Sequence, residues 1–214
     1  MIVIDIARIL TTLAASRPLF HSEADFQHAL AWRIHELCPN CSIRLEMRPP
    51  HTENRVYLDI WVTGQRATAI ELKYKTRGLR ATVDGEAFEL RDQSAQNFGR
   101  YDFLKDVQRL EQVISGSRGV AGYALLLTND SAYWRPPRDP APADASFRLH
   151  HGSVVAGPLD WAPRRLKGTM SGSRPPLSIH GPYRLLWRDY SAPVSGPYGK
   201  LRYLLVTVEG DTDP

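Results

Sequence analysis

The chain has 214 residues, 43% of them hydrophobic and 23% charged, and carries a formal net charge of +4. This composition suits one domain with a buried core and argues against a disordered chain. No apolar run approaches the roughly 20 residues that a membrane helix needs, so we expect no membrane partner.

The basic character of the chain favours polyanionic partners. The isoelectric point is near 9.2, and most of the 27 basic residues are arginine. Arginine suits bidentate contacts with phosphate. A GC-rich genome would produce the same arginine bias, so charge alone leaves the partner open.

Residues 3–16 have the pattern of an amphipathic helix. Isoleucine and leucine recur at helical spacing, and Asp5 and Arg8 interrupt the apolar run. A signal peptide would instead show a basic start followed by an uninterrupted apolar block. We therefore expect this helix in a cytoplasmic protein.

A second helix is predicted to begin at Ser22. The sequence Ser-Glu-Ala-Asp supplies a side-chain cap and an acid three residues later. The apolar stripe that follows at helical spacing consists of Phe26, Leu30, Ile34 and Leu37. Pro39 ends the helix.

Cys38 and Cys41 follow this helix in a Cys-Pro-Asn-Cys motif. One such pair can be half of a zinc site or a redox centre. No second cysteine pair exists, and the neighbouring histidines His150 and His151 are too isolated to complete a site. We therefore interpret the cysteines as two small residues that turn the chain from helix to strand.

Three strands are predicted after this turn. Residues 42–48 alternate apolar and polar side chains, which is typical of a half-buried strand. Residues 56–62 and 67–74 flank a turn around Gly64 and form a hairpin. A polar segment that contains glycine then continues to about residue 92.

A long helix is expected within residues 93–114, with an apolar stripe that includes Phe103. Residues 120–127 form a continuous apolar run, which suits a strand covered on both faces. The predicted core order is therefore α-β-β-β-α-β.

The C-terminal part carries weaker signals. Residues 147–152, 181–190 and 200–208 have strand-like patterns, and we expect them to extend the sheet or to form a small second one. The tryptophans of this part are either core anchors or surfaces on which bases stack. They are Trp134, Trp161 and Trp187.

The predicted hairpin carries charged residues on one face. Side chains alternate along a strand, so Glu71 and Lys73 share a face of the second arm. If the turn is centred near Gln65, Asp59 lies opposite Glu71, with side chains that start roughly 5 Å apart. Two carboxylates this close raise each other's pKa, and a divalent cation such as Mg²⁺ removes the conflict. The alternative is a solvated strand face with a cross-strand ion pair.

Glu23 adds a third acid. Its spacing from Phe26 and Leu30 puts it on the buried face of the second helix, pointing at the sheet. The alternative is a glutamate that the helix dipole favours at a helix N-terminus.

Taken together, these residues resemble the PD-(D/E)xK nuclease superfamily, which has the restriction-endonuclease-like fold. Asp59 followed by Glu-Leu-Lys at residues 71–73 is similar to the metal-binding signature of that superfamily. Leu58 stands where the name of the superfamily has proline, and Glu23 matches the acidic position on its first core helix.

The resemblance covers about residues 20–128. We therefore expect an α/β protein with a restriction-endonuclease-like αβββαβ core, in which helices flank a mixed central sheet. A β-rich extension with extra strands would occupy about residues 129–214. Both parts are expected to belong to a single domain spanning residues 1–214.

The resemblance also implies roles for the site residues. Asp59, Glu71 and the backbone carbonyl of Leu72 would hold Mg²⁺ or Mn²⁺, with Glu23 either a direct ligand or bound to one. Lys73 would orient the attacking water or stabilise the phosphoryl transition state. The reaction would be phosphodiester hydrolysis that leaves a 5′-phosphate, with no covalent enzyme intermediate.

Basic residues beside the signature are candidates for substrate binding. Lys105 and Arg109 lie on one stripe of the long helix together with Asp102 and Asp106, and Lys75 follows the signature. The alternative for the helix is a solvated face with ion pairs along it.

The implied function is a metal-dependent nuclease that acts on DNA. One alternative is a nuclease-fold module with little or no activity that binds nucleic acid or a protein partner. Another is a structural α/β domain whose acids are ion-paired. The intact set of Asp59, Glu71, Lys73 and Glu23 favours the enzyme. A homodimer is one assembly that the sequence leaves open.

Overall fold

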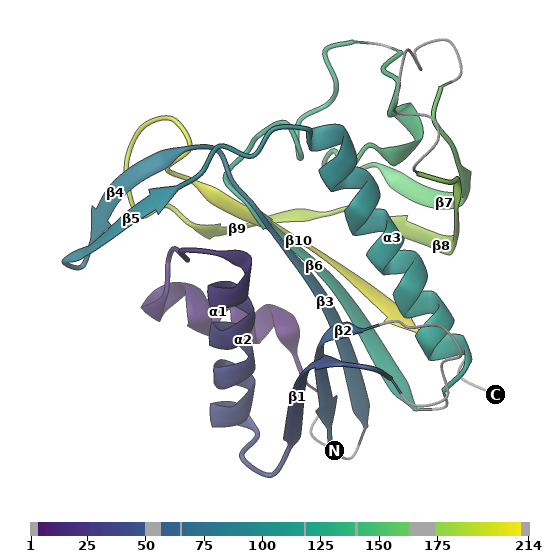
Figure 1. The fold of residues 1–214 in the computed structure, drawn as a ribbon, viewed down its shortest axis with the longest axis horizontal. Coiled ribbons are helices and arrows are strands. Elements are labelled where there is room, and N and C mark those ends of the chain that lie inside the picture. Colours follow the sequence, from purple (N-terminus) through teal and green to yellow (C-terminus); the bar gives the residue numbers. More distant parts are fainter. Residues whose placement is uncertain are drawn as a thin grey trace.

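A central β-sheet with helices on both faces dominates the fold (Figure 1). The computed structural model describes residues 4–49, 57–64, 66–117, 119–139, 141–162 and 174–210. The elements in chain order are α1 (Ile6–Ser16), α2 (Glu23–Leu37), β1 (Ser42–Met47), β2 (Leu58–Thr63), β3 (Ala67–Lys75), β4 (Leu79–Val83), β5 (Glu86–Leu90), α3 (Gln96–Ser115), β6 (Val120–Thr128), the short 3-10 helix η1 (Ala145–Phe147), β7 (Val154–Leu159), β8 (Leu177–Arg184), β9 (Trp187–Ser191) and β10 (Leu201–Glu209).

The main sheet has the strand order β1-β2-β3-β6-β10-β9. β3 and β6 run parallel, with α3 in the connection between them, and the other neighbours in this sheet are antiparallel. Two further pairs, β4–β5 and β7–β8, form separate two-stranded sheets. The described residues therefore form a mixed α/β protein with a mixed central sheet and three α-helices.

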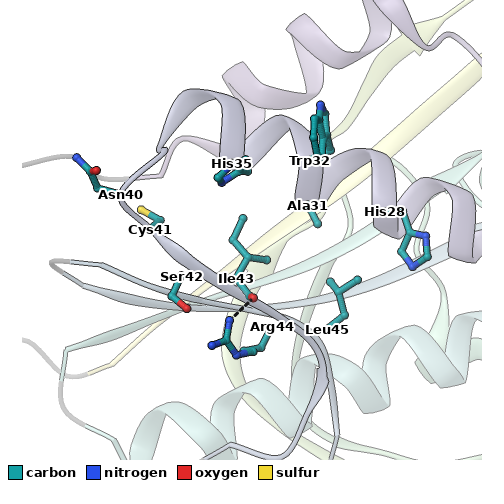
Figure 2. Close-up of a pocket in the computed structure, with 10 residues that line it drawn as sticks. All are labelled: His28, Ala31, Trp32, His35, Asn40, Cys41, Ser42, Ile43, Arg44 and Leu45. Atoms are coloured by element: carbon teal, nitrogen blue, oxygen red, sulfur yellow. Dashed lines mark hydrogen bonds between the residues drawn. The ribbon is translucent and has the colours of Figure 1, made fainter.

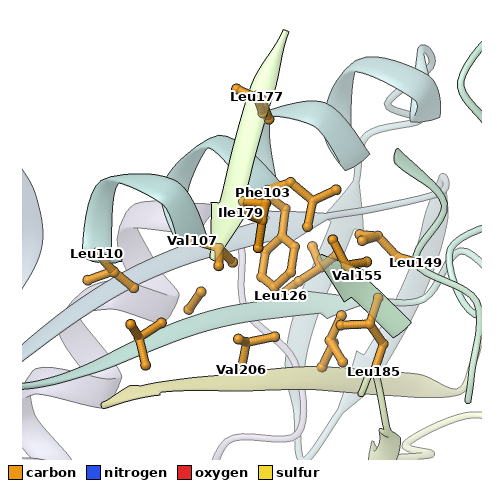
Figure 3. Packing of buried hydrophobic residues seen from close by; sticks show 14 of the residues in the cluster. Phe103, Val107, Leu110, Leu126, Leu149, Val155, Leu177, Ile179, Leu185 and Val206 are labelled. Carbon is orange, nitrogen blue, oxygen red and sulfur yellow. The ribbon is translucent and has the colours of Figure 1, made fainter. Parts of the chain in front are cut away.

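Both faces of the main sheet are covered. α1 and α2 pack on one face, where Ile60 of β2 and Ile70 of β3 belong to their core. α3 and the β7–β8 sheet pack on the opposite face, where Trp61 and Ala69 belong to a second core. Figure 3 shows side chains from α3, β6, β7, β8 and β10 converging in this second core. Alternation along β3 and along β2 from Ile60 onward thus divides the side chains between two covering layers, whereas Leu58 joins the same core as Trp61.

The elements of the predicted order α-β-β-β-α-β are present as α2, β1, β2, β3, α3 and β6, with the two strands β4 and β5 inserted between β3 and α3. Ser22 caps α2 by accepting a hydrogen bond from the N–H of Asp25, and the helix ends at Leu37, close to Pro39. The predicted first helix is also present and begins at Ile6. No helix in the described ranges is long and apolar enough to cross a membrane.

The polar segment after β3 forms the β4–β5 hairpin, which was not predicted. Its turn is Asp84-Gly85, and the two residues have φ angles of 51° and 84°. Positive φ at both central residues is the requirement of a common two-residue hairpin turn, and the Asp-Gly pair is the sequence signal for it. Phe88 and Leu90 of β5 are buried in the core of α1 and α2.

The prediction of a strand at residues 147–152 is wrong. Phe147 and Leu149 are buried in alternation as they would be in a strand, but none of the strands in the described ranges pairs with them. Instead the carbonyl of Leu149 accepts a hydrogen bond from the indole of Trp187. The strand of this region, β7, begins only at Val154.

The other C-terminal strands extend and supplement the sheet as expected. Residues 181–190 are divided between β8 and β9, and the strand predicted at residues 200–208 is confirmed by β10. β10 pairs with β6, so the C-terminal extension completes the main sheet. Both expected outcomes therefore occur, because β9 and β10 extend this sheet while β7 and β8 form a small second one.

The C-terminal tryptophans are structural. Trp161 and Trp187 are buried in the core beneath α3. Trp134 packs against Trp187, with ring centroids 5.7 Å apart. The base-stacking alternative is wrong for Trp161 and Trp187, because their rings are not accessible to a ligand.

Cys38 and Cys41 form a disulfide across the turn between α2 and β1. The predicted turn from helix to strand is confirmed, but the interpretation of the cysteines as two plain small residues is wrong. Disulfides are rare in cytosolic proteins. The disulfide therefore counts against the expected cytoplasmic location, which stays a prediction.

Truncation of Phe103 tests the core between α3 and the sheet. The Phe103 side chain is only 1% exposed, so Phe103→Ala is expected to lower the free energy of unfolding by about 3–5 kcal/mol. Urea unfolding followed by circular dichroism measures this loss. Trp32→Ala is the control, because Trp32 is 66% exposed on α2 and its loss should cost less than about 0.5 kcal/mol. Equal losses in the two variants would contradict this description of the core.

Candidate functional site

Asp59 and Glu71 lie opposite each other on the face of the β2–β3 pair that α3 covers. Ile60 of β2 pairs with Ile70 of β3, and one further step in this register brings Asp59 opposite Glu71. Gln65, on which the predicted turn is centred, lies outside the described residues, but the register on either side of it is the predicted one. The two carboxyl groups are close enough that the charge of Asp59 raises the pKa of Glu71, after burial and the charge of Asp106.

The acids stand where β2 separates from β3. Beyond Ile70 the β2–β3 pairing ends, so the N–H groups of Leu72 and Tyr74 need other acceptors. Oδ2 of Asp59 accepts a hydrogen bond from the N–H of Leu72 at 2.7 Å. Oε2 of Glu23 accepts one from the N–H of Tyr74 at 2.8 Å. Two of the predicted site acids therefore accept hydrogen bonds from backbone N–H groups of β3 that do not pair with β2.

Gln27 fixes the backbone at Asp59 from the α2 side of the sheet. Its side-chain amide donates to the carbonyl of Asp59 at 2.7 Å and to Oε1 of Glu46 at 2.9 Å. Gln27 is buried on α2, and Glu46 has a left-handed backbone with φ 49°. These bonds join α2, β1 and β2 at the point from which Asp59 projects.

Lys73 is held between β3 and α3. Its Nζ lies 2.7 Å from Oδ2 of Asp106 and donates to the carbonyl of Leu72 at 3.1 Å. Burial lowers the pKa of Lys73, but the charge and hydrogen bond of Asp106 and the charges of Asp59 and Glu23 together raise it by more. Lys73 is therefore a charged ammonium group at neutral pH.

Arg109 connects α3 to Glu71. Its Nη1 lies 2.7 Å from Oε1 of Glu71 and 3.3 Å from Oδ1 of Asp106. Among the described residues, the cluster thus contains three carboxyl groups, those of Asp59, Glu71 and Asp106, and two cations, Lys73 and Arg109. When every group is ionised, the cluster carries excess negative charge.

The pKa values of all three carboxyl groups are raised, with burial as the largest cause. Burial and the charges of Asp106 and Asp59 raise the pKa of Glu71 to about 9, and Arg109 offsets only part of that shift. Burial also raises the pKa of Asp59, which the N–H of Leu72 partly offsets. Burial raises the pKa of Asp106 in the same way, against the opposing effects of Lys73 and Arg109. Glu71 therefore holds a proton at neutral pH unless another cation approaches.

One oxygen of Glu71 is free to bind a ligand. Oε2 of Glu71 is buried and has no hydrogen-bond donor in the part of the chain that the structure describes. Within the same ranges, no group of three or more His, Cys, Asp or Glu side chains is arranged to hold a metal ion. Mg²⁺ needs only one or two carboxylates, because water and substrate phosphates complete its coordination. Asp59, Glu71 and the carbonyl of Leu72 therefore fit this ion, while Glu23 is engaged with the backbone of β3.

A pocket of about 550 Å³ adjoins the cluster. Lys105 and Arg109 line it from α3, and Tyr57, two residues before Asp59, lines it from the start of β2. Two of the predicted substrate-binding residues therefore face one pocket beside the acids. Lys75 is half-buried at the end of β3 and does not line this pocket.

A larger pocket, of about 700 Å³, lies away from the cluster (Figure 2). It runs between α2 and the edge strand β1, and its walls include Trp32, Ile43 and Leu45. None of the described residues that line it is an aspartate or glutamate. This pocket therefore offers no carboxylate to a metal ion.

Gln27 belongs to the cluster but was not predicted as a site residue. Asp106 was predicted only as part of the charged stripe of the long helix, without a role of its own. The predicted alternative of a solvated, ion-paired helix face is wrong for Asp106, which is 4% exposed and reaches Lys73 on β3. An acid so close to the apolar stripe of a helix is the signal that could have found it. No local signal marks Gln27, because its partners are remote in sequence.

Comparison with known proteins does not assign this site. No family model, curated protein or solved structure matches the chain. The interpretation of the cluster therefore depends on its geometry and on the resemblance of its residues to the nuclease signature.

The raised pKa of Glu71 predicts a stability that declines as the pH rises. Between about pH 5 and about pH 9, the folded protein keeps a proton that the unfolded chain has released, so folding becomes less favourable with increasing pH. Glu71→Gln removes this titration and is expected to flatten the decline. Urea unfolding across this pH range, in buffer with a chelator, measures the difference. Glu36→Gln, an exposed acid on α2, is the control and should keep the wild-type profile, and a wild-type profile for Glu71→Gln would contradict the prediction.

Proposed function

We propose that this protein is a metal-dependent nuclease that hydrolyses phosphodiester bonds of DNA. The observation that carries the proposal is the buried Oε2 of Glu71, which has no donor among the described residues and belongs to a carboxyl group next to Asp59. A buried carboxylate oxygen without a partner is costly unless a proton or a cation satisfies it. The excess of carboxyl groups over cations favours a further cation.

The order of the elements supports the same proposal. The αβββαβ order of the restriction-endonuclease-like core is matched by α2, β1, β2, β3, α3 and β6. In addition, β3 runs parallel to β6. On this basis we propose such a core for about residues 20–128. β9 and β10 would then be an extension of its sheet.

Asp59, Glu71 and the carbonyl of Leu72 are the groups that would hold Mg²⁺ or Mn²⁺. Such an ion lowers the pKa of water and neutralises charge that develops on a phosphate. Glu23 would act indirectly, because its carboxylate holds the backbone of β3 one residue beyond Lys73.

Lys73 would stabilise the negative charge that develops on the phosphate. Its pKa is raised by Asp106, Asp59 and Glu23 against the effect of burial, so it stays protonated across the neutral range. A protonated amine suits electrostatic stabilisation, whereas a general base must first be neutral. The charge of Lys73 therefore supports the second of the two predicted roles, stabilisation of the phosphoryl transition state.

DNA is the proposed substrate because of the charge around the cluster. The chain carries a net charge of +4, and Lys105 and Arg109 line the adjoining pocket. Cations near a phosphodiesterase site attract the phosphates that flank the bond to be cut.

A second candidate is a nuclease-fold module with little or no turnover that binds nucleic acid or a protein partner. The hydrogen bonds of Asp59 and Glu23 to β3 and the ion pair of Lys73 with Asp106 favour it. Those contacts give the same residues a structural role that needs no reaction.

Loss of the Asp59 charge tests the metal site. Asparagine can still accept the Leu72 N–H, so Asp59→Asn should keep the strand geometry while removing one anionic ligand. Calorimetric titration with Mn²⁺ is expected to show binding to the wild type and binding weaker by about tenfold or more in the variant. Glu36→Gln on α2 is the matched control and should bind as the wild type does. Equal affinities of the wild type and Asp59→Asn would rule out this metal site.

Loss of the Lys73 charge tests the catalytic role. Lys73→Met keeps most of the side-chain length, so we expect Mn²⁺ binding to persist while DNA cleavage falls by about 100-fold or more. Cleavage of single- and double-stranded DNA is measured by gel electrophoresis. Lys200→Met, an exposed position on the loop before β10, is the control. Wild-type cleavage by Lys73→Met would contradict this role, and a wild type that binds Mn²⁺ without cutting would favour the second candidate.

A further inference from the structure

The pocket beside the acids has walls from three parts of the chain. Its lining includes Tyr57 and, from α3, Lys105, Gln108, Arg109 and Gln112. The opposite wall is formed by residues 175–177. Tyr101 of α3 donates its hydroxyl hydrogen to the carbonyl of Pro175 at 2.8 Å, which ties this wall to the helix.

The pocket is basic. Lys105 and Arg109 line it, and none of its described lining residues is an aspartate or a glutamate. Lys105 is exposed and has no ion-pair partner among the described residues. Lys105 is thus an unmatched cation on a concave surface, which attracts an anion. Arg109 also contacts Glu71 and Asp106, but its guanidinium has several N–H donors and matches a phosphate in shape.

The same pocket offers groups that recognise a flat, polar ring. Tyr57 is 54% exposed at its edge, and exposed aromatic rings are the surfaces on which nucleobases stack. Gln108 and Gln112 lie one turn apart on α3, so both side chains face the pocket. Each amide has a donor and an acceptor, as the edge of a base requires.

We propose that this pocket binds one nucleotide of the substrate strand. Its base would lie against Tyr57 and the amides of Gln108 and Gln112, and its phosphate would meet Lys105 and Arg109. A volume of about 550 Å³ is in the range of pockets that enclose small ligands.

The inference deepens the proposed function and rests on it, because the pocket and the acid cluster share a residue. Arg109 lines the pocket and also contacts Oε1 of Glu71 at 2.7 Å. Tyr57 precedes Asp59 by two residues. A strand with one nucleotide in this pocket would therefore have its neighbouring phosphate beside the carboxyl groups.

A comparison of two DNA strands tests the inference without any cleavage. The probes are a fluorescein-labelled single strand of about 12 nucleotides and a strand of equal length and charge that lacks all bases. Fluorescence anisotropy in buffer with a chelator gives both affinities. The wild type is expected to bind the strand with bases about tenfold more tightly, and Tyr57→Ala is expected to remove that preference while keeping the affinity for the abasic strand.

Two further variants separate base recognition from charge. Lys105→Gln should weaken binding of both strands by the same factor, because it removes a phosphate contact. Trp32→Ala removes an exposed aromatic residue on α2 and should change neither affinity. The inference is overturned if the wild type binds both strands equally or binds neither, or if Tyr57→Ala keeps the preference for bases. If the wild type binds DNA in a base-dependent way but never cuts it, the nucleotide pocket is supported and only the proposed nuclease activity is contradicted.

Discussion

The separation of β2 from β3 is the constraint on which the site depends. Past Ile70 the two strands no longer pair, and β3 presents backbone N–H groups that must find acceptors. Carboxylates of Asp59 and Glu23 supply them from two different elements. A continued β-ladder would have satisfied the same groups without charge. The separation of the two strands therefore requires that acids be buried. It also places the carboxyl group of Asp59 next to that of Glu71.

The buried charges of the cluster are stabilised by ion pairs between side chains of β3 and side chains of α3. Asp106 contacts both Lys73 and Arg109, and Arg109 contacts Glu71. Removal of one partner from such a buried pair costs several times more than an exposed pair contributes, because the remaining charge stays desolvated. The pairing is incomplete, since three carboxyl groups share two cations. Burial, together with the charges of Asp106 and Asp59, raises the pKa of Glu71, and Arg109 offsets only part of that shift.

α3 links this chemistry to the rest of the molecule. Its apolar side chains pack between the main sheet and β8, so its position is set by a core in which Phe103 is almost fully buried. The adjacent stripe of the same helix supplies Asp106 and Arg109 to the cluster and Lys105 to the pocket. The helix therefore sets the distance between the acids and the pocket that Lys105 and Arg109 line.

The sequence by itself determined the three α-helices, most of the main-sheet strands and the face on which the charges lie. Alternation along β2 and β3 is local, so it sufficed to put Asp59, Glu71 and Lys73 on one side of the hairpin, and the helical periodicities gave the order α-β-β-β-α-β. Only the tertiary structure decided the partners of these charges. Asp106 meets Lys73 because the chain crosses over through α3, and Gln27 reaches Asp59 from the opposite layer. The same dependence explains residues 147–152, which alternate like a strand but pair with none of the strands that the structure describes. Local patterns fix which way a side chain points, while its partner depends on packing between segments far apart in the chain.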